Sequence, residues 1–157
     1  MKYMKTGVLM MAAALAGCAQ YEVLSVAGKD TNRWKLIQQG QGEQSTTSAI
    51  YSDGVSGIIY EHGKERSAFM VGIGNDPRCD DTMLVGEKHY AAEHMQQQKG
   101  GYNICWRLVT GQEAHAIATD MAKATSIMVN GREFDVRGFD ALWKNLFRRQ
   151  DRDAGAT

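Results

Sequence analysis

The apolar segment at the start of the chain determines which residues remain to form the folded domain. Lys2 and Lys5 precede an apolar stretch over residues 8–15, and Cys18 follows shortly after it. A short basic segment followed by a short apolar one is typical of a cleavable export signal. An apolar run of about 10 to 14 residues is too short to span a bilayer. We therefore expect residues 1–17 to be a signal peptide that is removed.

The residues at the predicted cleavage site carry a more specific signal. The run Leu15, Ala16, Gly17 and Cys18 resembles the lipobox of bacterial lipoprotein precursors. In such precursors the cysteine thiol is diacylated, the peptide is cut before the cysteine, and the new amino terminus is usually acylated too. The resemblance covers residues 1–18 and implies a covalent lipid, such as palmitate, on Cys18. The alternative is a buried first helix that ends at a core cysteine.

This resemblance also implies where the protein is held. Two or three acyl chains, at about 0.8 kcal/mol per buried methylene, hold a protein on a membrane essentially permanently. Ala19 stands where inner-membrane lipoproteins of enterobacteria carry Asp, which implies an outer-membrane protein that faces the periplasm or the outside. We expect residues 18–32 to be the lipidated N-terminus and tether. No cofactor is expected beyond the lipid on Cys18.

The composition after the signal peptide describes one ordinary domain. The chain has 157 residues, 43% of them apolar and 23% charged, with 18 basic and 18 acidic residues. Removing Lys2 and Lys5 leaves two more acidic than basic residues, whereas a nucleic-acid surface needs clustered Lys and Arg. We expect no nucleic-acid partner, a single globular domain over residues 33–149, and a frayed tail over residues 150–157.

The export prediction changes the interpretation of the remaining cysteines. Cys79 and Cys105 are the only two thiols left when Cys18 carries lipid. In an oxidising compartment an even pair is interpreted first as a disulfide, and closing a loop of about 27 residues contributes roughly 3 to 4 kcal/mol. A reactive thiol lacks a C-x-x-C motif, and a zinc site lacks the usual ligand spacing. The four histidines are scattered at His62, His89, His94 and His115.

Short β-rich runs separated by turn residues predict a body of antiparallel strands. Residues 38–48 contain no apolar residue and are expected to form a loop, and residues 96–101 a polar turn. Residues 89–95 fit a strand or a short helix equally well. The predicted strands are residues 34–37, 58–60, 67–73, 82–85 and 102–109, with some strand in residues 21–26.

One of these strands has a clear alternation of side chains. Tyr102, Ile104, Trp106 and Leu108 share one face of the strand over residues 102–109. Cys105 would then point to the opposite face.

The last third of the chain predicts two helices around a hairpin. Thr110 and Glu113 match a capping box, and apolar residues at helical spacing follow over residues 111–123. Asn130 and Gly131 separate two β-rich runs, 127–129 and 133–136, and this pair accepts positive φ at both corners of a type I′ turn. The last helix is expected over residues 140–149. It carries an apolar stripe of Phe139, Leu142, Trp143, Leu146 and Phe147.

Together these elements predict an α+β fold that is mostly antiparallel β, as a sandwich-like or curved sheet. The order of an early Trp strand, hairpins, a late Cys, a helix, and a hairpin leading into residues 134–142 resembles the invasion-associated locus B type of periplasmic β-sandwich protein. The resemblance covers roughly residues 34–147, with the usual cysteine pattern only partly present. It implies a β-sandwich and assigns no role to any residue.

Two clusters of titratable residues are candidate sites. Glu87, His89, Glu93 and His94 provide the groups of acid–base catalysis but lack the H-E-x-x-H spacing of a zinc site. Asp76, Asp80 and Asp81 surround Cys79 with oxygen ligands that suit calcium but lack the repeated calcium-loop spacing. We expect solvated polar stretches in both places, with no metal site and no catalytic residues.

The function expected from the sequence is that of a non-enzymatic binding module in the cell envelope. Its partner would be an envelope protein, and its role that of an inhibitor or immunity protein, an exclusion factor, or an assembly component. The alternative is a small envelope hydrolase that acts on peptidoglycan through Glu93 with His89 or His94. The sequence leaves the partner, the oligomeric state and the side of the outer membrane open. Candidate interface residues, each with core burial as the alternative, are Tyr51, Tyr60, Tyr90 and Trp106.

Overall fold

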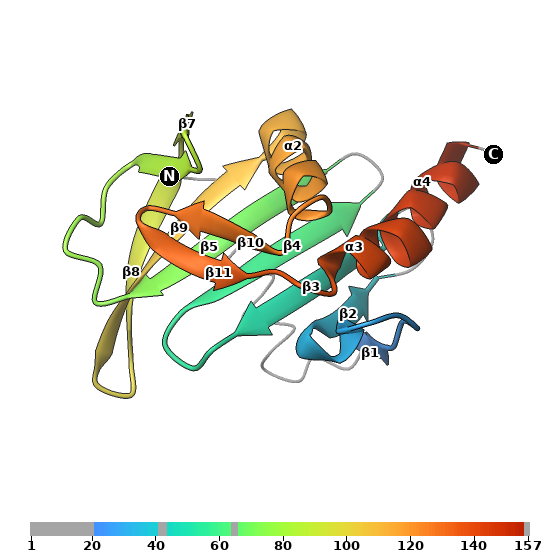
Figure 1. The fold of residues 1–157 in the computed structure, drawn as a ribbon, viewed down its shortest axis with the longest axis horizontal. Coiled ribbons are helices and arrows are strands. Elements are labelled where there is room, and N and C mark those ends of the chain that lie inside the picture. The colour runs from blue at the N-terminus through green and yellow to red at the C-terminus, as the bar shows by residue number, and fades with distance from the viewer. Residues whose placement is uncertain (1–20, 41–43, 64–65, 156–157) are drawn as a thin grey trace.

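The chain folds into two antiparallel sheets with helices on one side. The computed structural model describes residues 21–40, 44–63 and 66–155 (Figure 1). The large sheet has the spatial order β1 (Tyr21–Leu24), β2 (Lys35–Gln39), β3 (Thr46–Ser52), β4 (Gly57–Gly63), β5 (Ser67–Gly74), β9 (Tyr102–Thr110) and β8 (Glu93–Lys99). The small sheet has the order β11 (Arg132–Asp135), β10 (Ser126–Val129), β6 (Thr82–Val85) and β7 (Lys88–Ala91). This architecture confirms the predicted α+β class with mostly antiparallel strands.

The helices in the described part of the chain are few. They are the short η1 (Thr31–Arg33), the helix α2 (Gly111–Met121), and a C-terminal helix made of α3 (Phe139–Leu142), the π-helical turn η3 (Trp143–Phe147) and α4 (Arg148–Gly155). Within the described residues, no helix has both the length and the apolar character required to cross a bilayer.

The core lies between the large sheet and everything that covers its inner face. Side chains that alternate along β4 and β5, including Tyr60, Phe69 and Val71, join one buried cluster with residues of α2, the C-terminal helix and the small sheet. In Figure 1 α2, α3 and the small sheet all lie on this side of the large sheet. We call the covered side the inner face and the opposite side the outer face. Antiparallel sheets with one such buried face show the alternation that the sequence displays.

The alternation predicted for residues 102–109 is confirmed in β9. Tyr102, Trp106 and Leu108 pair with residues of β8 that lie on the outer face, and Trp106 and Leu108 belong to a separate outer-face cluster. Cys105 and Arg107 take the alternate positions and therefore point to the inner face, toward the small sheet.

The hairpin predicted at Asn130 and Gly131 is also confirmed. Their φ angles are 48° and 82°, so both corners are in the left-handed region that a type I′ turn requires. Asn130 has a second role, because its side chain accepts from the Leu84 amide at 2.6 Å and donates to the Thr82 carbonyl at 3.3 Å. The turn residue thereby fastens β6 to the hairpin of β10 and β11.

Several expected boundaries are wrong. The loop expected over residues 38–48 is partly strand, because β3 begins at Thr46 and pairs with both β2 and β4. The polar turn expected over residues 96–101 is shorter, because β8 continues to Lys99 and pairs there with Tyr102. In both places the ladder of backbone hydrogen bonds overrides the polar side chains, whose composition had suggested a loop.

The two ends of the domain also differ from expectation. Part of the expected tether, residues 18–32, is folded, since β1 pairs with β2 and the buried Thr31 hydroxyl donates to the Val26 carbonyl at 2.6 Å. The expected frayed tail, residues 150–157, is helical as far as Gly155. The helix α2 begins as expected after Thr110, but without the expected capping box, because the Thr110 side chain makes no capping hydrogen bond.

The start of the C-terminal helix depends on a close backbone approach. Gly138 has φ of 93°, and a Cβ at this position would overlap the Asp30 carbonyl oxygen. Next to it, the Trp34 indole N–H donates to the Arg137 carbonyl at 3.0 Å. These contacts join the N-terminal segment to the helix.

We predict that Gly138→Ala lowers the free energy of unfolding by about 2 kcal/mol or more, because it adds a steric clash to the cost of positive φ. Gly131→Ala is the matched control: it has φ of 82° with nothing within 4 Å of a new Cβ, so it should cost only about 1 kcal/mol. Urea denaturation of both variants checks this. Equal losses would contradict the proposed close approach.

Candidate functional site

The loop that connects the two sheets lies against the inner face of β9 and β8. The loop covers residues 75–81, between β5 and β6. At its start the Asn75 amide donates to the Asn103 carbonyl at 2.6 Å, and near its end the Asp81 carbonyl accepts from the Ala92 amide at 2.8 Å. The loop is thus held at both ends by backbone hydrogen bonds, and it contains the three aspartates that the sequence singled out around Cys79.

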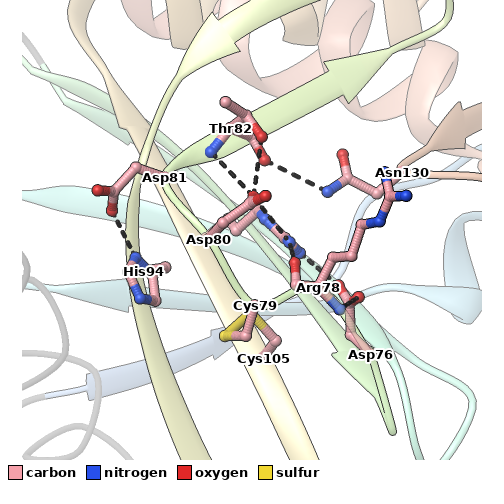
Figure 2. Close-up of a disulfide and its surroundings, with 10 residues drawn as sticks. Asp76, Arg78, Cys79, Asp80, Asp81, Thr82, His94, Cys105 and Asn130 are labelled. Atoms are coloured by element: carbon pink, nitrogen blue, oxygen red, sulfur yellow. Dashed lines mark hydrogen bonds and ion pairs between the residues drawn. A yellow bond between two sulfur atoms is a disulfide. The ribbon is translucent and has the colours of Figure 1, made fainter.

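The two cysteines join the middle of this loop to β9. The sulfur atoms of Cys79 and Cys105 lie 2.10 Å apart and their Cα atoms 5.6 Å apart, as a disulfide requires (Figure 2). This geometry agrees with the predicted pairing. Cys18, the predicted lipid-bearing residue, lies outside the described residues.

A fully buried arginine lies one inner-face position farther along β9. Arg107 has no exposed surface. Its Nη1 donates to Asp76 Oδ2 at 2.6 Å, and its Nη2 donates to the Arg78 carbonyl and, at 3.4 Å, to Asp80 Oδ1. A buried guanidinium is tolerated only with such charged and polar partners. Its Nε has no hydrogen-bond partner within the described residues, so the compensation is incomplete.

The three aspartates around Cys79 therefore contact the protein's own side chains. Asp76 and Asp80 contact Arg107. Asp81 Oδ1 accepts from His94 Nδ1 at 2.5 Å (Figure 2). Hydrogen bonds from Thr82, and then from Arg107, hold the pKa of Asp80 below its ordinary value. Among the described residues no group of three or more acidic, His or Cys side chains is placed to hold a metal ion. Residues 75–81 therefore form a polar turn that is held in place by contacts with β8 and β9.

The residues considered for acid–base chemistry do not converge. His89 lies exposed on β7 of the small sheet, and Glu87 lies in the turn before it. Glu93 and His94 are consecutive on β8 of the large sheet, so Glu93 faces the outer side and His94 the inner side. His94 Nδ1 contacts Asp81 of the loop.

Two of the four candidate interface residues belong to the core. Tyr60 has no exposed surface and Tyr90 is 5% exposed, and both lie in the inner-face cluster. Their burial corrects the idea that they offer contact surface. Tyr51 is partly buried, with its ring 5.7 Å from the Trp34 ring and below the Arg33 guanidinium. Only Trp106 combines partial exposure with a place on the outer face.

Trp106 is the centre of a surface at the end of the large sheet. Its indole N–H donates to Gln97 Oε1 at 2.9 Å, and its ring lies so close over Gly72 that a Cβ there would be 2.8 Å from ring atoms. Met95 pairs directly with Trp106, and Tyr102 is 45% exposed near the tip of the same hairpin. We call Met95, Gln97, Tyr102 and Trp106 the outer-face patch.

The outer-face patch continues into a small apolar cluster. Ile59, Met70 and Leu108 are buried on this face, and among the described residues the side chains packed around them come from strands of the large sheet itself. An apolar centre with an aromatic and amide rim is the usual composition of a protein-binding surface. The outer-face patch is therefore our candidate functional site.

A second polar network, which the sequence did not indicate, lies under the C-terminal helix. His62 is buried at 4% exposure, and its Nε2 donates to Asp151 Oδ1 at 2.7 Å. On the other side of the ring, His62 Nδ1 and the Tyr60 hydroxyl share a hydrogen bond of 2.8 Å. Burial, with a smaller effect of the Asp151 charge, raises the pKa of Tyr60 to about 12. The network holds α4 on the sheet.

Comparisons of this chain with protein-family models, with curated proteins and with solved structures found no match.

We predict that Arg107→Ala lowers the free energy of unfolding by about 3 to 5 kcal/mol, because it leaves the Asp76 carboxylate, 9% exposed, without its partner. Arg137→Ala is the matched control, since Arg137 and its partner Asp135 are 52% and 35% exposed and exposed ion pairs contribute little. Urea denaturation followed by circular dichroism measures both. Similar losses for the two variants would show that Arg107 is an ordinary ion-pair residue.

We also predict that the protein loses stability between pH 10 and about 12 because of Tyr60. The phenol of the unfolded chain ionises near its ordinary pKa of 10.0, whereas the folded protein keeps the proton until about 12. The contribution is complete below pH 10 and falls by about 2 kcal/mol across this window. Tyr60→Phe should flatten the decline in the unfolding free energy, while Tyr102→Phe, at an exposed position, should leave it unchanged. Parallel curves for all three proteins would refute the assignment.

Proposed function

We propose that this protein is an outer-membrane lipoprotein whose folded domain is a non-enzymatic binding module of the cell envelope. The observation that carries the proposal is the run of residues 15–18, which resembles a lipobox and ends in Cys18. The disulfide geometry of Cys79 and Cys105 supports it, because such pairs persist in oxidising compartments outside the cytosol.

The start of the fold suits attachment at Cys18. Only Ala19 and Gln20 separate Cys18 from Tyr21, the first residue of β1. The three Cα–Cα steps from Cys18 to Tyr21 span at most about 11 Å. A lipid on Cys18 would therefore hold the β1 end of the large sheet close to the membrane surface, and β8 lies at the other end of this sheet.

The binding surface in this proposal is the outer-face patch. Trp106 and Met95 supply an apolar centre, while Gln97 and Tyr102 supply polar groups beside it. Such a surface suits a protein partner in the envelope, with the chain acting as an inhibitor or immunity protein, an exclusion factor, or an assembly component. The positions of His89, Glu93 and His94 do not favour a hydrolase, because these residues lie on different sheets or on opposite faces of one strand.

The lipid anchor is tested by substitution of the cysteines. Cys18→Ser should abolish metabolic labelling with a palmitate analogue and move the protein from the membrane fraction to the soluble fraction. The double variant Cys79→Ala and Cys105→Ala is the control and should keep the label, since its lipid-bearing thiol is intact. Undiminished labelling of the Cys18→Ser protein would exclude the anchor.

The binding surface is tested by placing one charge on each side of the molecule. Met95→Arg changes the outer-face patch, and Met128→Arg makes the same change on β10, where Met128 is 45% exposed. Crosslinking in cells followed by affinity capture should recover one stoichiometric partner with the native and Met128→Arg proteins. We expect recovery to fall about tenfold with Met95→Arg, because a charge in a desolvated contact is costly. Equal recovery with both variants would place the interface elsewhere.

A further inference from the structure

The edge strands of the two sheets are unequal. In the described part of the chain the sheets end in four edge strands, of which β1, β7 and β11 have four residues each and β8 has seven. Exposed edges invite pairing with another strand, and proteins commonly shorten them or place prolines and charges along them. The edge strands β1, β7 and β11 are short, whereas β8 is not.

The sequence of β8 leaves the middle of this edge unprotected. Residues 94–98 read His, Met, Gln, Gln, Gln, with no proline and no lysine, and the residues from Gln96 to Lys99 are exposed. Charged residues stand only at the two ends of the strand, as Glu93 and Lys99. Glutamine amides can donate and accept at the same time, so they pair well across a strand interface.

The order of residues in β8 is complementary to itself. In an antiparallel pair of two copies centred on Gln96, Glu93 lies opposite the partner's Lys99 and Lys99 lies opposite the partner's Glu93. At the centre Gln96 meets the partner's Gln96, and Met95 meets the partner's Gln97. Opposite charges at directly facing positions favour such a pair. A shift by one residue would lose both charge pairs and turn the side chains to the wrong faces.

We propose that two copies of this chain pair through β8 into one continuous antiparallel sheet with two-fold symmetry. The symmetry axis is perpendicular to the sheet, so the outer faces of both copies point the same way. The two β1 strands then lie at the same level along this axis. Two lipid anchors can then enter one membrane. The pairing itself does not need the anchor; that it joins two outer-face patches into one binding surface rests on the proposed function.

The test uses the full chain with Cys18→Ser, so that no lipid drives association, and measures mass by light scattering over a dilution series. The protein should be dimeric. Gln96→Lys and Gln96→Glu should each weaken the dimer about fivefold, because like charges then face each other on the two-fold axis. An equimolar mixture of the two variants should restore the dimer. Gln112→Lys, which places the same charge on an exposed position of α2, is the control and should associate like the parent.

Three results would overturn the proposal. They are a monomeric parent protein, a Gln96→Lys protein that dimerises like the parent, and a mixture of charge variants that does not recover. Thermal unfolding of each variant ensures that the comparison is made between folded proteins. A monomeric parent that still captures its envelope partner through the outer-face patch would refute self-pairing and leave the proposed function intact. A dimer that captures no envelope partner would support self-pairing and contradict the proposed function.

Discussion

The buried Arg107 is the constraint on which the arrangement of the two sheets depends. A guanidinium without exposed surface has to be compensated inside the protein, and the groups that compensate it belong to the loop of residues 75–81. This loop is the connection from β5 of the large sheet to β6 of the small sheet. Because Arg107 needs these partners, the loop is held at one place on β9, and the Cys79 to Cys105 bridge beside it adds a covalent link. Together these contacts fix how the small sheet lies over the large one.

The two faces of the large sheet consequently have different roles. The inner face is filled by the small sheet and the helices, and it contains the buried polar groups, Arg107 and His62, whose partners come from distant parts of the chain. The outer face has a smaller cluster built from the strands themselves, with Trp106 lying over Gly72. Among the described residues, the contacts between distant parts of the chain are therefore concentrated on the inner face.

Local signals in the sequence predicted the local structure well. The alternation of β9 and the Asn130 and Gly131 turn needed only neighbouring residues, and the disulfide followed from the number of cysteines. Strand β3 was missed because its threonines and serines look like a loop until β2 and β4 pair with them. The helical end of the chain was missed because it depends on contacts between Asp151 and His62 and between Gln150 and Thr47, far apart in sequence. Of the candidate site, Trp106 was found, but Met95, Gln97 and Tyr102 joined it only through strand pairing.

The position of the C-terminal helix sets the order in which the fold can be completed. It covers β3 and β4, which are made early in synthesis, with residues that are made last: Gln150 reaches Thr47 across 103 positions, and Asp151 reaches His62 across 89. Contacts of this kind form late, since the chain between them must first be closed into a loop. Tyr60 of β4 packs against Phe139 and Phe147 of this helix, so its ring is fully buried only after the last part of the chain has been made.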